Sequence, residues 1–347
     1  GSASSANTAE RLIGQYDFSQ KLTATYRIHP GVDIHEHYEY DHMGRLKKIF
    51  HNINQNGEVL LASYNYNELG QLIEKNFHST NGGTSFLQSA DFRYNIRGWL
   101  TSINNSTLTN DGGATNNDTN DLFGMNLIYN QEVLSIDGQN SLPLYDGRIT
   151  AAKWMTNDLL RPTKERAYSY FYDEKERFQQ AKFSAKNGSG WTDEVGHYNL
   201  EGIEYDDNGN IKKLIRYGKV NNAKSLIDNL TYDYSTKGNQ LTAVEDLGSS
   251  LGYPNATVGV ATELDYDKSG NLKSDLNSQI TAVQYNYLNL PEKITIDLPN
   301  TANDNIIEFT YDGKGYLIKK VYKKGSAIVR PIQYDEGIQY IDGVLSI

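Results

Sequence analysis

The stretch Tyr38-Glu39-Tyr40-Asp41-His42-Met43-Gly44-Arg45-Leu46 decides the fold, because its pattern recurs along the chain in one frame. If the second aromatic residue is the anchor, Asp or Asn follows it directly, Gly comes four residues later and an apolar residue six residues later. Nine stretches follow this frame with drift. Their anchors and glycines are Tyr40 with Gly44, Tyr66 with Gly70, Tyr94 with Gly98, Tyr172, Tyr205 with Gly209, Tyr234 with Gly238, Tyr266 with Gly270, Tyr287, and Tyr311 with Gly315.

Each position in the pattern has a physical reason. Aromatic residues two apart, as in Tyr38 and Tyr40 or Tyr64 and Tyr66, point to the same face of a strand. Asp or Asn caps the following turn through its side-chain oxygen, and Gly supplies a positive φ without steric cost. Each copy therefore predicts a β-hairpin. The aspartates at the capping position are Asp41, Asp173, Asp206, Asp267 and Asp312.

Three copies depart from the pattern. Glu176 replaces Gly after Tyr172, and Pro291 replaces Gly after Tyr287. Because neither residue adopts a positive φ as easily as Gly, we expect these two turns to differ in shape. In the copy at Tyr234 the apolar residue comes one place late, at Leu241.

The spacing of the anchors predicts a repeat array. Apart from one long gap they lie 21 to 33 residues apart, a range typical of internal repeats. A lone hairpin is marginally stable, so neighbouring hairpins are expected to pair edge to edge. We predict an all-β fold in which tandem hairpins form a curved, spiralling β-sheet strip over residues 21–347, after a lead-in or linker over 1–20 and with an irregular insertion at about 101–165.

Composition excludes several classes of function. The chain of 347 residues carries a formal charge of −10, which opposes binding to nucleic acid. It has no cysteine, so disulfides and cysteine chemistry are excluded. No apolar run is long enough for a membrane span.

Some segments outside the repeats also carry expectations. The lead-in has helical potential near Glu10-Arg11-Leu12-Ile13, and residues 22–28 read as a first strand. Residues 104–121, rich in Asn, Thr, Asp and Gly, indicate a loop or a disordered insertion. Residues 123–129 and 145–154 indicate degenerate continuations of the sheet, and residues 333–345 two further short strands.

The repeats resemble the YD repeat of RHS-type proteins. The stretches that carry this resemblance are 38–46, 264–272 and 309–317, with the central segments 123–129, 146–154 and 166–170 similar to RHS proteins of the Bacteroidetes type. The tail Ile338-Gln339-Tyr340-Ile341-Asp342-Gly343-Val344-Leu345 looks like the stretch before the RHS-associated core. The resemblance covers residues 30–347.

The resemblance implies a β-strip that spirals into a hollow shell. In complete members the shell encloses a C-terminal toxin or other cargo, and a core region after the repeats cleaves itself with aspartates. We expect this chain to end before that core, and to form an open strip without the protease. It also implies a secreted bacterial protein, located outside the cell or at its surface, whose partners are the C-terminal cargo and cell-surface glycans.

Candidate chemical sites compete with simpler interpretations. His35 and His37, with His42 nearby, share a strand face as metal ligands would, but a polar strand edge explains them better. Residues 206–210 hint at a calcium loop, yet lack its full spacing. Recurring aspartates suit a glycosidase pair less well than turn capping. We therefore predict no catalytic residues, no cofactor and no metal, and a chain that is not an enzyme.

The tyrosines leave two functions open. If they pack on neighbouring repeats, they stabilise the sheet, and the chain is a structural segment of a shell. If they are exposed, they can stack on sugar rings, and the chain is a carbohydrate- or cell-surface-binding module. Regular recurrence favours the first interpretation.

Overall fold

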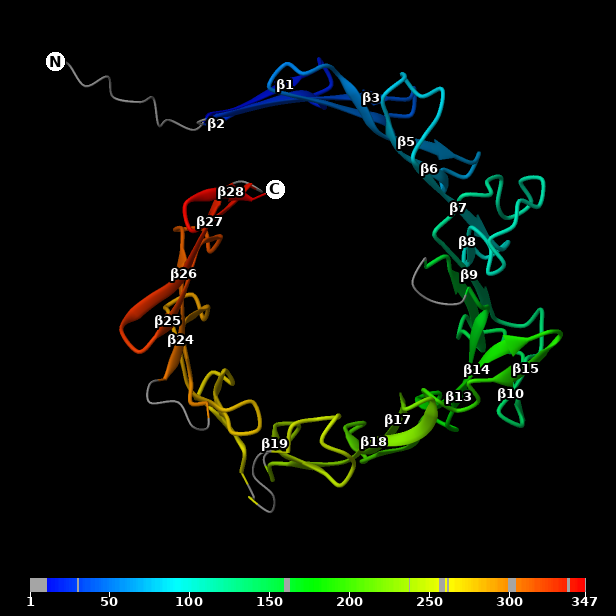
Figure 1. The fold of residues 1–347 in the computed structure, drawn as a ribbon, viewed down its shortest axis with the longest axis vertical. Coiled ribbons are helices and arrows are strands. Elements are labelled where there is room, and N and C mark those ends of the chain that lie inside the picture. Colours follow the sequence, from blue (N-terminus) through cyan, green and yellow to red (C-terminus); the bar gives the residue numbers. More distant parts are fainter. Residues whose placement is uncertain are drawn as a thin grey trace. The chain divides into compact units, whose positions relative to one another are not determined.

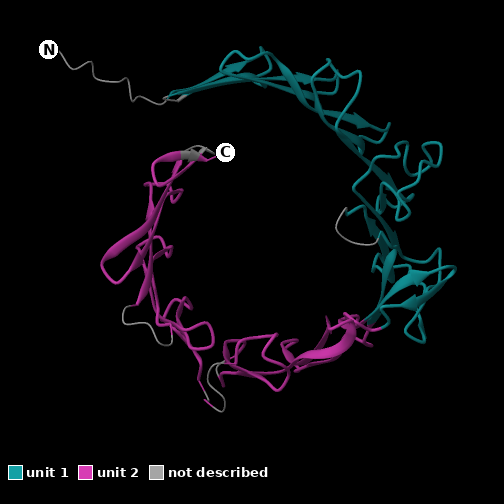
Figure 2. Ribbon diagram, in the orientation of Figure 1, with its two compact units in different colours: residues 1–171, 182–195 teal, residues 172–181, 196–347 magenta. Residues whose placement is uncertain are grey.

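A computed structural model of the protein describes residues 11–29, 31–158, 163–236, 238–255, 260, 262–298, 304–335 and 338–346. The chain divides into two compact units (Figure 2). Unit 1 comprises residues 1–171 and 182–195, and unit 2 comprises residues 172–181 and 196–347. Throughout the described residues the regular structure consists of β-strands (Figure 1), which confirms the all-β prediction.

Unit 1 is built from strands that pair mostly with their neighbours in sequence. The antiparallel pairs run in order from β1 to β9, and β9 then pairs with β12, which pairs with β13. The strands are β1 (Arg11–Tyr16), β2 (Leu22–His29), β3 (Val32–Tyr40), β4 (Leu46–Ile53), β5 (Val59–Tyr66), β6 (Leu72–Ser79), β7 (Gln88–Tyr94), β8 (Leu100–Ile103), β9 (Phe123–Ile128), β10 (Ser135–Ile136), β11 (Gln139–Asn140), β12 (Ala151–Thr156), β13 (Arg166–Tyr172), the larger part of β14 (Phe178–Asn187) and β15 (Gly190–Asp193).

Unit 2 repeats the same neighbour-to-neighbour pairing. One antiparallel series runs from β16 to β19 and another from β20 to β28. The strands are β16 (Leu200–Tyr205), β17 (Ile211–Val220), β18 (Ala223–Tyr234), β19 (Leu241–Asp246), β20 (Leu264–Tyr266), β21 (Leu272–Asp275), β22 (Ile280–Tyr285), β23 (Pro291–Ile296), β24 (Asn305–Tyr311), β25 (Leu317–Lys324), β26 (Ala327–Asp335), β27 (Ile338–Ile341) and β28 (Val344–Ser346).

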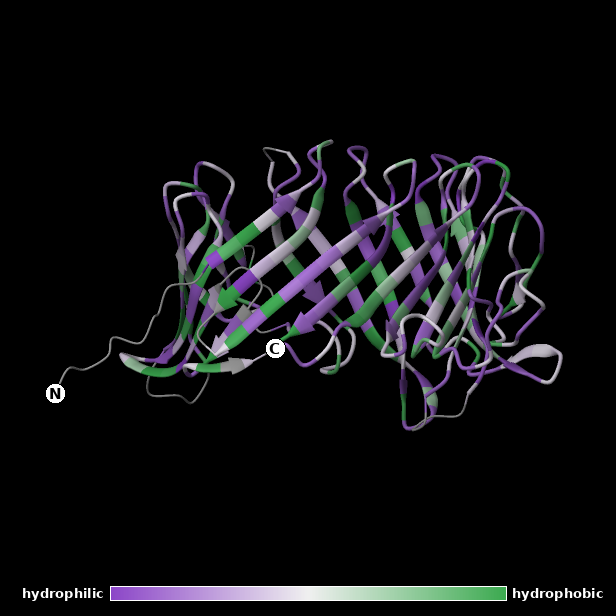
Figure 3. Ribbon diagram, turned by 90° about the horizontal axis from the view of Figure 1, so that it is seen from above, coloured by the Kyte–Doolittle hydropathy of each residue, from purple (hydrophilic) through white to green (hydrophobic). Residues whose placement is uncertain are grey.

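The sheets are a single layer for most of their length, so few side chains are fully buried. Polar and apolar residues are interleaved along the strands (Figure 3). A packed core forms in unit 1, where Ile128, Leu134, Ile136, Ala151 and Ala167 cluster. It lies where the β10–β11 hairpin supplements the main sheet, because a second layer is needed to exclude water from both faces.

The repeat turns share one geometry, seen first at Asp41, except that the turn after Tyr234 is one residue longer, with the Ser235 N–H donating to the Gln240 carbonyl. The Asp41 N–H donates to the Arg45 carbonyl at 2.9 Å, and the Gly44 N–H donates to the Asp41 carbonyl at 2.8 Å. The Asp41 carboxylate accepts from the N–H groups of Met43 and Arg45. Gly44 has a φ of +78°, and Tyr40 pairs with Leu46 across a register shift. The predicted hairpin is therefore formed, with aspartate as its cap.

Our expectation that two turns differ in shape is wrong. Glu176 adopts a φ of +65° and donates its N–H to the Asp173 carbonyl, as Gly44 does to Asp41. In the repeat that the sequence pattern assigned to Tyr287, the anchor lies two residues earlier in the chain than predicted. Tyr285 is the anchor and pairs with Pro291, while Asn289 takes the glycine position with a φ of +58°. Asn accepts the left-handed conformation more readily than most residues, which preserves the turn.

The lead-in contains a further repeat that the sequence pattern did not single out. The prediction of helical potential near Arg11 is wrong, since strand β1 begins at this residue and pairs with β2. Tyr16 pairs with Leu22, and Asp17 caps the turn between them, with Gln20 at a φ of +63°. Glu10, the other end of that predicted helix, lies outside the described residues.

Other segment predictions have mixed outcomes. The strand expected at residues 22–28 is present as β2, that at 123–129 as β9, and that within 145–154 as β12. The two tail strands are β27 and β28, although residues 336–337 between β26 and β27 lie outside the described residues. The insertion at 104–121 is a loop that side-chain hydrogen bonds order, rather than a disordered segment.

Candidate functional site: a tyrosine ladder and a polar pocket

Six anchor tyrosines connect each hairpin to the one before it. Each hydroxyl donates to the main-chain carbonyl of the residue that lies six places after the preceding anchor. The oxygen–oxygen distance is 2.8 Å for Tyr40 and 2.9 Å for Tyr66, Tyr234, Tyr285 and Tyr311. We call this set the tyrosine ladder; its pairs are Tyr40 with Leu22, Tyr66 with Leu46, Tyr205 with Phe178, Tyr234 with Ile211, Tyr285 with Leu272 and Tyr311 with Pro291.

Arginines reinforce two steps of the ladder. Arg45 is held by the Asp41 carboxylate at 2.7 Å, and its guanidinium lies over the ring of the next anchor, Tyr66, at 4.6 Å. Arg177 repeats the arrangement between Asp173 and Tyr205, with a guanidinium–ring distance of 4.3 Å. One aspartate thus caps its own turn and also orients a cation onto the neighbouring hairpin.

The local electrostatics keeps the ladder tyrosines protonated and the capping aspartates ionised, as these hydrogen bonds require. Burial raises the pKa of Tyr66, which the nearby Arg45 lowers by less, so the hydroxyl stays a donor at neutral pH. Hydrogen bonds from Asn210, first from its side chain, hold the pKa of Asp206 below its usual value. Partial desolvation raises the pKa of Asp173, but the hydrogen bonds and the charge of Arg177 lower it by more, so the pKa is below its usual value.

The predicted repeat residues thus divide into three groups. The anchors named above, together with Tyr94, Tyr172 and Tyr266, lie at the hairpin ends, and Tyr38 and Tyr64 lie two residues before their anchors. The capping aspartates and the glycines lie in the turns; the glycines with positive φ are Gly44, Gly70, Gly98, Gly209, Gly238, Gly270 and Gly315. Tyr287 is the exception, since it is a turn residue with 85% exposure rather than an anchor.

Unit 1 also contains an open pocket of about 750 Å³. Strands β4 to β7 form its floor, and the loops 82–85 and 117–120 form its sides. Twelve of the sixteen lining residues have polar side chains, and Leu60 and Phe86 supply apolar surface. Its amides come from Asn65, Asn76, Gln88, Asn117 and Asn120. Such a surface offers both donors and acceptors to a neutral polar ligand.

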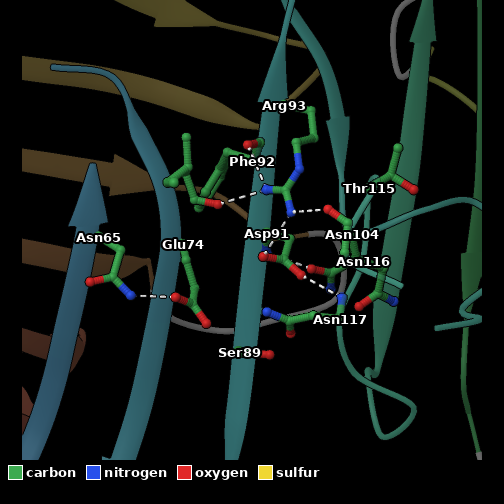
Figure 4. Close-up of polar contacts among 12 residues, drawn as sticks. Asn65, Glu74, Ser89, Asp91, Phe92, Arg93, Asn104, Thr115, Asn116 and Asn117 are labelled. Carbon is green, nitrogen blue, oxygen red and sulfur yellow. Dashed lines mark hydrogen bonds and ion pairs between the residues drawn. The ribbon is translucent and has the colours of Figure 1, made fainter. Parts of the chain in front are cut away.

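Arg93 holds the insertion loop beside this pocket (Figure 4). Its guanidinium donates to the carbonyls of Ala114 at 3.1 Å and Gly113 at 3.2 Å in the loop. On the other side it donates to the carbonyl of Ile73 at 3.0 Å. Arg93 therefore joins strand β6 to the middle of the insertion, and its fixed fork of donors suits this role.

Buried carboxylates complete this network. Asp91 is 1% exposed, accepts from the Asn117 N–H at 2.9 Å and contacts Arg93 at 3.4 Å. Burial raises the pKa of Asp91, and these two partners lower it by less. Asp121 is equally buried; burial raises its pKa while its contact with Asn116 opposes the rise. The network holds the insertion against the sheet beside the pocket, whose own charged lining residues are Lys48, Glu74 and Asp118.

Sequence reasoning missed the pocket because its walls come from separate parts of the chain. Gln88 and Ser89 on β7 bind Asn120 and Asp118 of the insertion. The available signal was the density of Asn, Asp and Thr in residues 104–121, which indicates a loop or a disordered insertion and gives no sign of a binding pocket.

The other candidate sites form no metal cluster among the described residues. His37 binds Glu58 through Nδ1 at 3.0 Å, and its ring stacks on Phe50 at 4.3 Å. His35 stacks on Tyr26 at 4.3 Å. The Asp206 carboxylate accepts from the N–H groups of its own turn, so this segment is a repeat turn.

Comparisons with known proteins give weak likenesses. No family model and no curated protein matches the sequence. Among solved structures, TcdB2-TccC3 matches with 12% identity and a TM-score of 0.26, over 96% of this chain and 21% of that one. A Photorhabdus luminescens Tc holotoxin pore gives the same identity and TM-score, over 20% of its chain. A porin-like protein from Bacteroides uniformis gives 12% identity and a TM-score of 0.22, over 91% of its chain.

These identities and scores do not place the chain in a family. The chain spans about a fifth of the length of the toxin chains that it matches. Where the chain is described, it contains no helix that is both long and apolar enough to cross a membrane.

Proposed function

We propose that the chain is a non-enzymatic wall segment of an RHS/YD-repeat shell, which encloses or displays a C-terminal toxin or other cargo outside the cell or at its surface. The tyrosine ladder is the observation that carries this proposal. In it, the hydroxyl of an anchor tyrosine binds the neighbouring hairpin. Such contacts make hairpins cohere into a continuous sheet, curved into a spiral in our proposal.

The turn chemistry agrees with a structural role. Asp41, Asp173 and Asp206 are committed to their own turns, and their lowered pKa values disfavour a general acid at neutral pH. We accordingly assign no catalytic residue and no cofactor. A hydrolase screen that found turnover dependent on one of these aspartates would refute this assignment.

The ladder can be tested by removing single hydroxyl groups. Tyr66→Phe deletes the bond to Leu46 and is expected to lower the free energy of unfolding by about 0.5–1.5 kcal/mol. Tyr16→Phe is the matched control: it is an anchor in the same kind of turn, but it is 65% exposed, and its hydroxyl has no hydrogen-bond partner among the described residues. Equal losses for both variants in urea unfolding would contradict the ladder.

The shell is tested in the natural protein together with its proposed cargo segment. Limited proteolysis should spare this segment while the wall is intact. Deleting the hairpin of β24 and β25 should expose that segment to cleavage, with circular dichroism showing that the remaining sheet persists. Cleavage at the same rate before and after the deletion would contradict enclosure.

The polar pocket favours a second function, the binding of a cell-surface glycan. Its amides and hydroxyls match the hydrogen-bonding groups of a sugar, and Phe86 supplies a ring. A glycan array probed with the chain should lose signal on Phe86→Ala or Gln88→Ala. Tyr287→Ala is the control, because Tyr287 is an exposed tyrosine far along the sequence in unit 2. Loss of signal in the control alone would favour binding by exposed tyrosines.

A further inference from the structure

One face of the sheet in unit 2 carries an apolar row that ends on a cation. Ile294, Ile307, Tyr322 and Arg330 are directly paired across β23, β24, β25 and β26. Directly paired residues project to the same face of a sheet. Ile296 and Asn305 form the next row on this face.

A pocket of about 440 Å³ opens on this face. Ile296, Ile307 and Ile332 line it with apolar side chains, together with the ring of Tyr322. None of its described lining residues is an aspartate or a glutamate. The pocket is therefore able to hold a hydrocarbon group and offers no carboxylate to a cationic one.

Two hydrogen-bond donors of the pocket lack acceptors. The Asn305 side-chain nitrogen is buried and has no hydrogen-bond partner in the part of the chain that the structure describes, and leaving such a donor unpaired is costly. Arg330 forms no ion pair with any described residue, whereas Lys323, the other cation of the lining, is paired with Glu308 at 2.5 Å. Both free donors line the same pocket.

The surrounding charge agrees with these donors. Residues 317–334 contain five lysine or arginine residues and no acidic residue, in a chain with a net charge of −10. Ile328 and Val329 in the same hairpin are each 64% exposed. An apolar surface beside unpaired positive charge complements an anion that carries a hydrocarbon chain.

We propose that this pocket binds a small apolar carboxylate, a molecule of the fatty-acid class. Its carboxylate pairs with the Arg330 guanidinium, and its hydrocarbon chain lies across Ile296, Ile307 and Ile332. This site is independent of the wall-segment proposal, since it would exist whether or not the chain encloses cargo.

The test is calorimetric titration of the full chain with decanoate, below the concentration at which decanoate forms micelles. Decanol, with the same hydrocarbon chain and no charge, is the comparison ligand. We expect one decanoate per chain, with at least tenfold tighter binding than decanol, because a charge-assisted pair is added. Arg330→Gln should reduce decanoate binding to the level of decanol and leave decanol binding unchanged.

Two further variants keep the result interpretable. Lys314→Gln removes an exposed cation of the same unit at a turn outside the pocket and should leave decanoate binding unchanged. Val329→Ser replaces an exposed lining residue and should weaken both ligands by a similar factor. Equal affinities for decanoate and decanol, no binding of either, or unchanged binding by a folded Arg330→Gln variant would each overturn the proposal.

Discussion

The repeat turns and the central insertion solve the same problem, a chain reversal beside a sheet, in opposite ways. In a repeat turn such as that of Asp41, a partly exposed carboxylate accepts from N–H groups within four residues. In the insertion, Asp91 is buried and accepts from Asn117, which is 26 residues away. Each repeat turn depends on local contacts and on contacts with the adjacent hairpin, whereas the insertion depends on distant residues that must all be in place.

This difference predicts where a single substitution does the most damage. A repeat turn should lose only its own local contacts and those with the adjacent hairpin when one residue changes. The insertion should lose many contacts at once, because Arg93 alone connects β6, β7 and residues 113–114.

The largest effect is expected for Arg93→Met. The substitution removes the donors to Ile73, Gly113 and Ala114 and leaves Asp91 buried without its cation. Removing one partner of a buried ion pair costs about 3–5 kcal/mol, and this loss should appear in urea unfolding of the chain. Hydrogen exchange of residues 104–121 should rise more than that of the hairpin at Tyr66.

A double substitution separates charge from packing at this position. Asp91→Asn combined with Arg93→Met removes both charges, so its cost should be smaller than the sum of the two single costs. Strict additivity would mean that Arg93 acts through its carbonyl contacts alone.

An intermediate effect is expected for glycine in a repeat turn. Gly315 has a φ of +89°, and its added methyl group would also meet Leu290 at 3.3 Å. Gly315→Ala should therefore cost about 1–2 kcal/mol, the price of a left-handed residue with a side chain. Gly313 in the same turn has no positive φ and open space around it, so Gly313→Ala is the matched control and should be neutral or slightly stabilising.

Glu176 provides the reverse experiment. It already holds the glycine position with a φ of +65°, so Glu176→Gly should relieve strain and stabilise the chain by up to about 1 kcal/mol. If this variant is instead destabilised, the contacts of the Glu176 side chain outweigh the backbone strain, and the turn is less uniform than its hydrogen bonds indicate.

The same contrast explains how much of the structure the sequence could predict. Each hairpin is specified within about seven residues, so the strands and turns around Tyr40, Tyr205 and Tyr311 could be predicted from the pattern alone. The shift at Tyr285 was missed because Tyr285-Asn286-Tyr287 contains two possible anchors. Only the glycine position, filled by Asn289, distinguishes them.

The polar pocket and the tyrosine ladder could not be predicted from the repeat pattern, for two different physical reasons. The ladder joins a hydroxyl to a backbone carbonyl about 13 to 27 residues away, and a carbonyl has no signature in sequence. The pocket requires the insertion to fold back on β7, which depends on buried polar contacts rather than on apolar periodicity. The repeat pattern identifies the residues of the sheet and its turns but not the additional surfaces built beside them.

The smallest effects are expected in the ionisation of single aspartates, and these have opposite signs in the two regions. The pKa of Asp267 is lowered, chiefly by the Asn271 side chain. Its stabilisation is present above the unfolded pKa of about 3.9 and is lost as the pH falls through the lower folded value. The pKa of Asp121 is raised by burial, so its contribution is present below about 3.9 and is lost as the pH rises through the higher folded value.

Carboxyl-carbon NMR titration measures both groups in one sample. Asp267 should titrate below about 3.9 and Asp121 above it. Asp121→Asn, which keeps the shape and removes the buried charge, should accordingly be neutral or stabilising at pH 7, and this gain should disappear near pH 4. Asp267→Asn should change little at either pH, because Asn67 and Asn95 already cap equivalent turns. A low pKa for Asp121 would mean that water or a bound cation reaches the insertion. The carboxylates of the insertion and of the repeat turns would then both be stabilised in the ionised form.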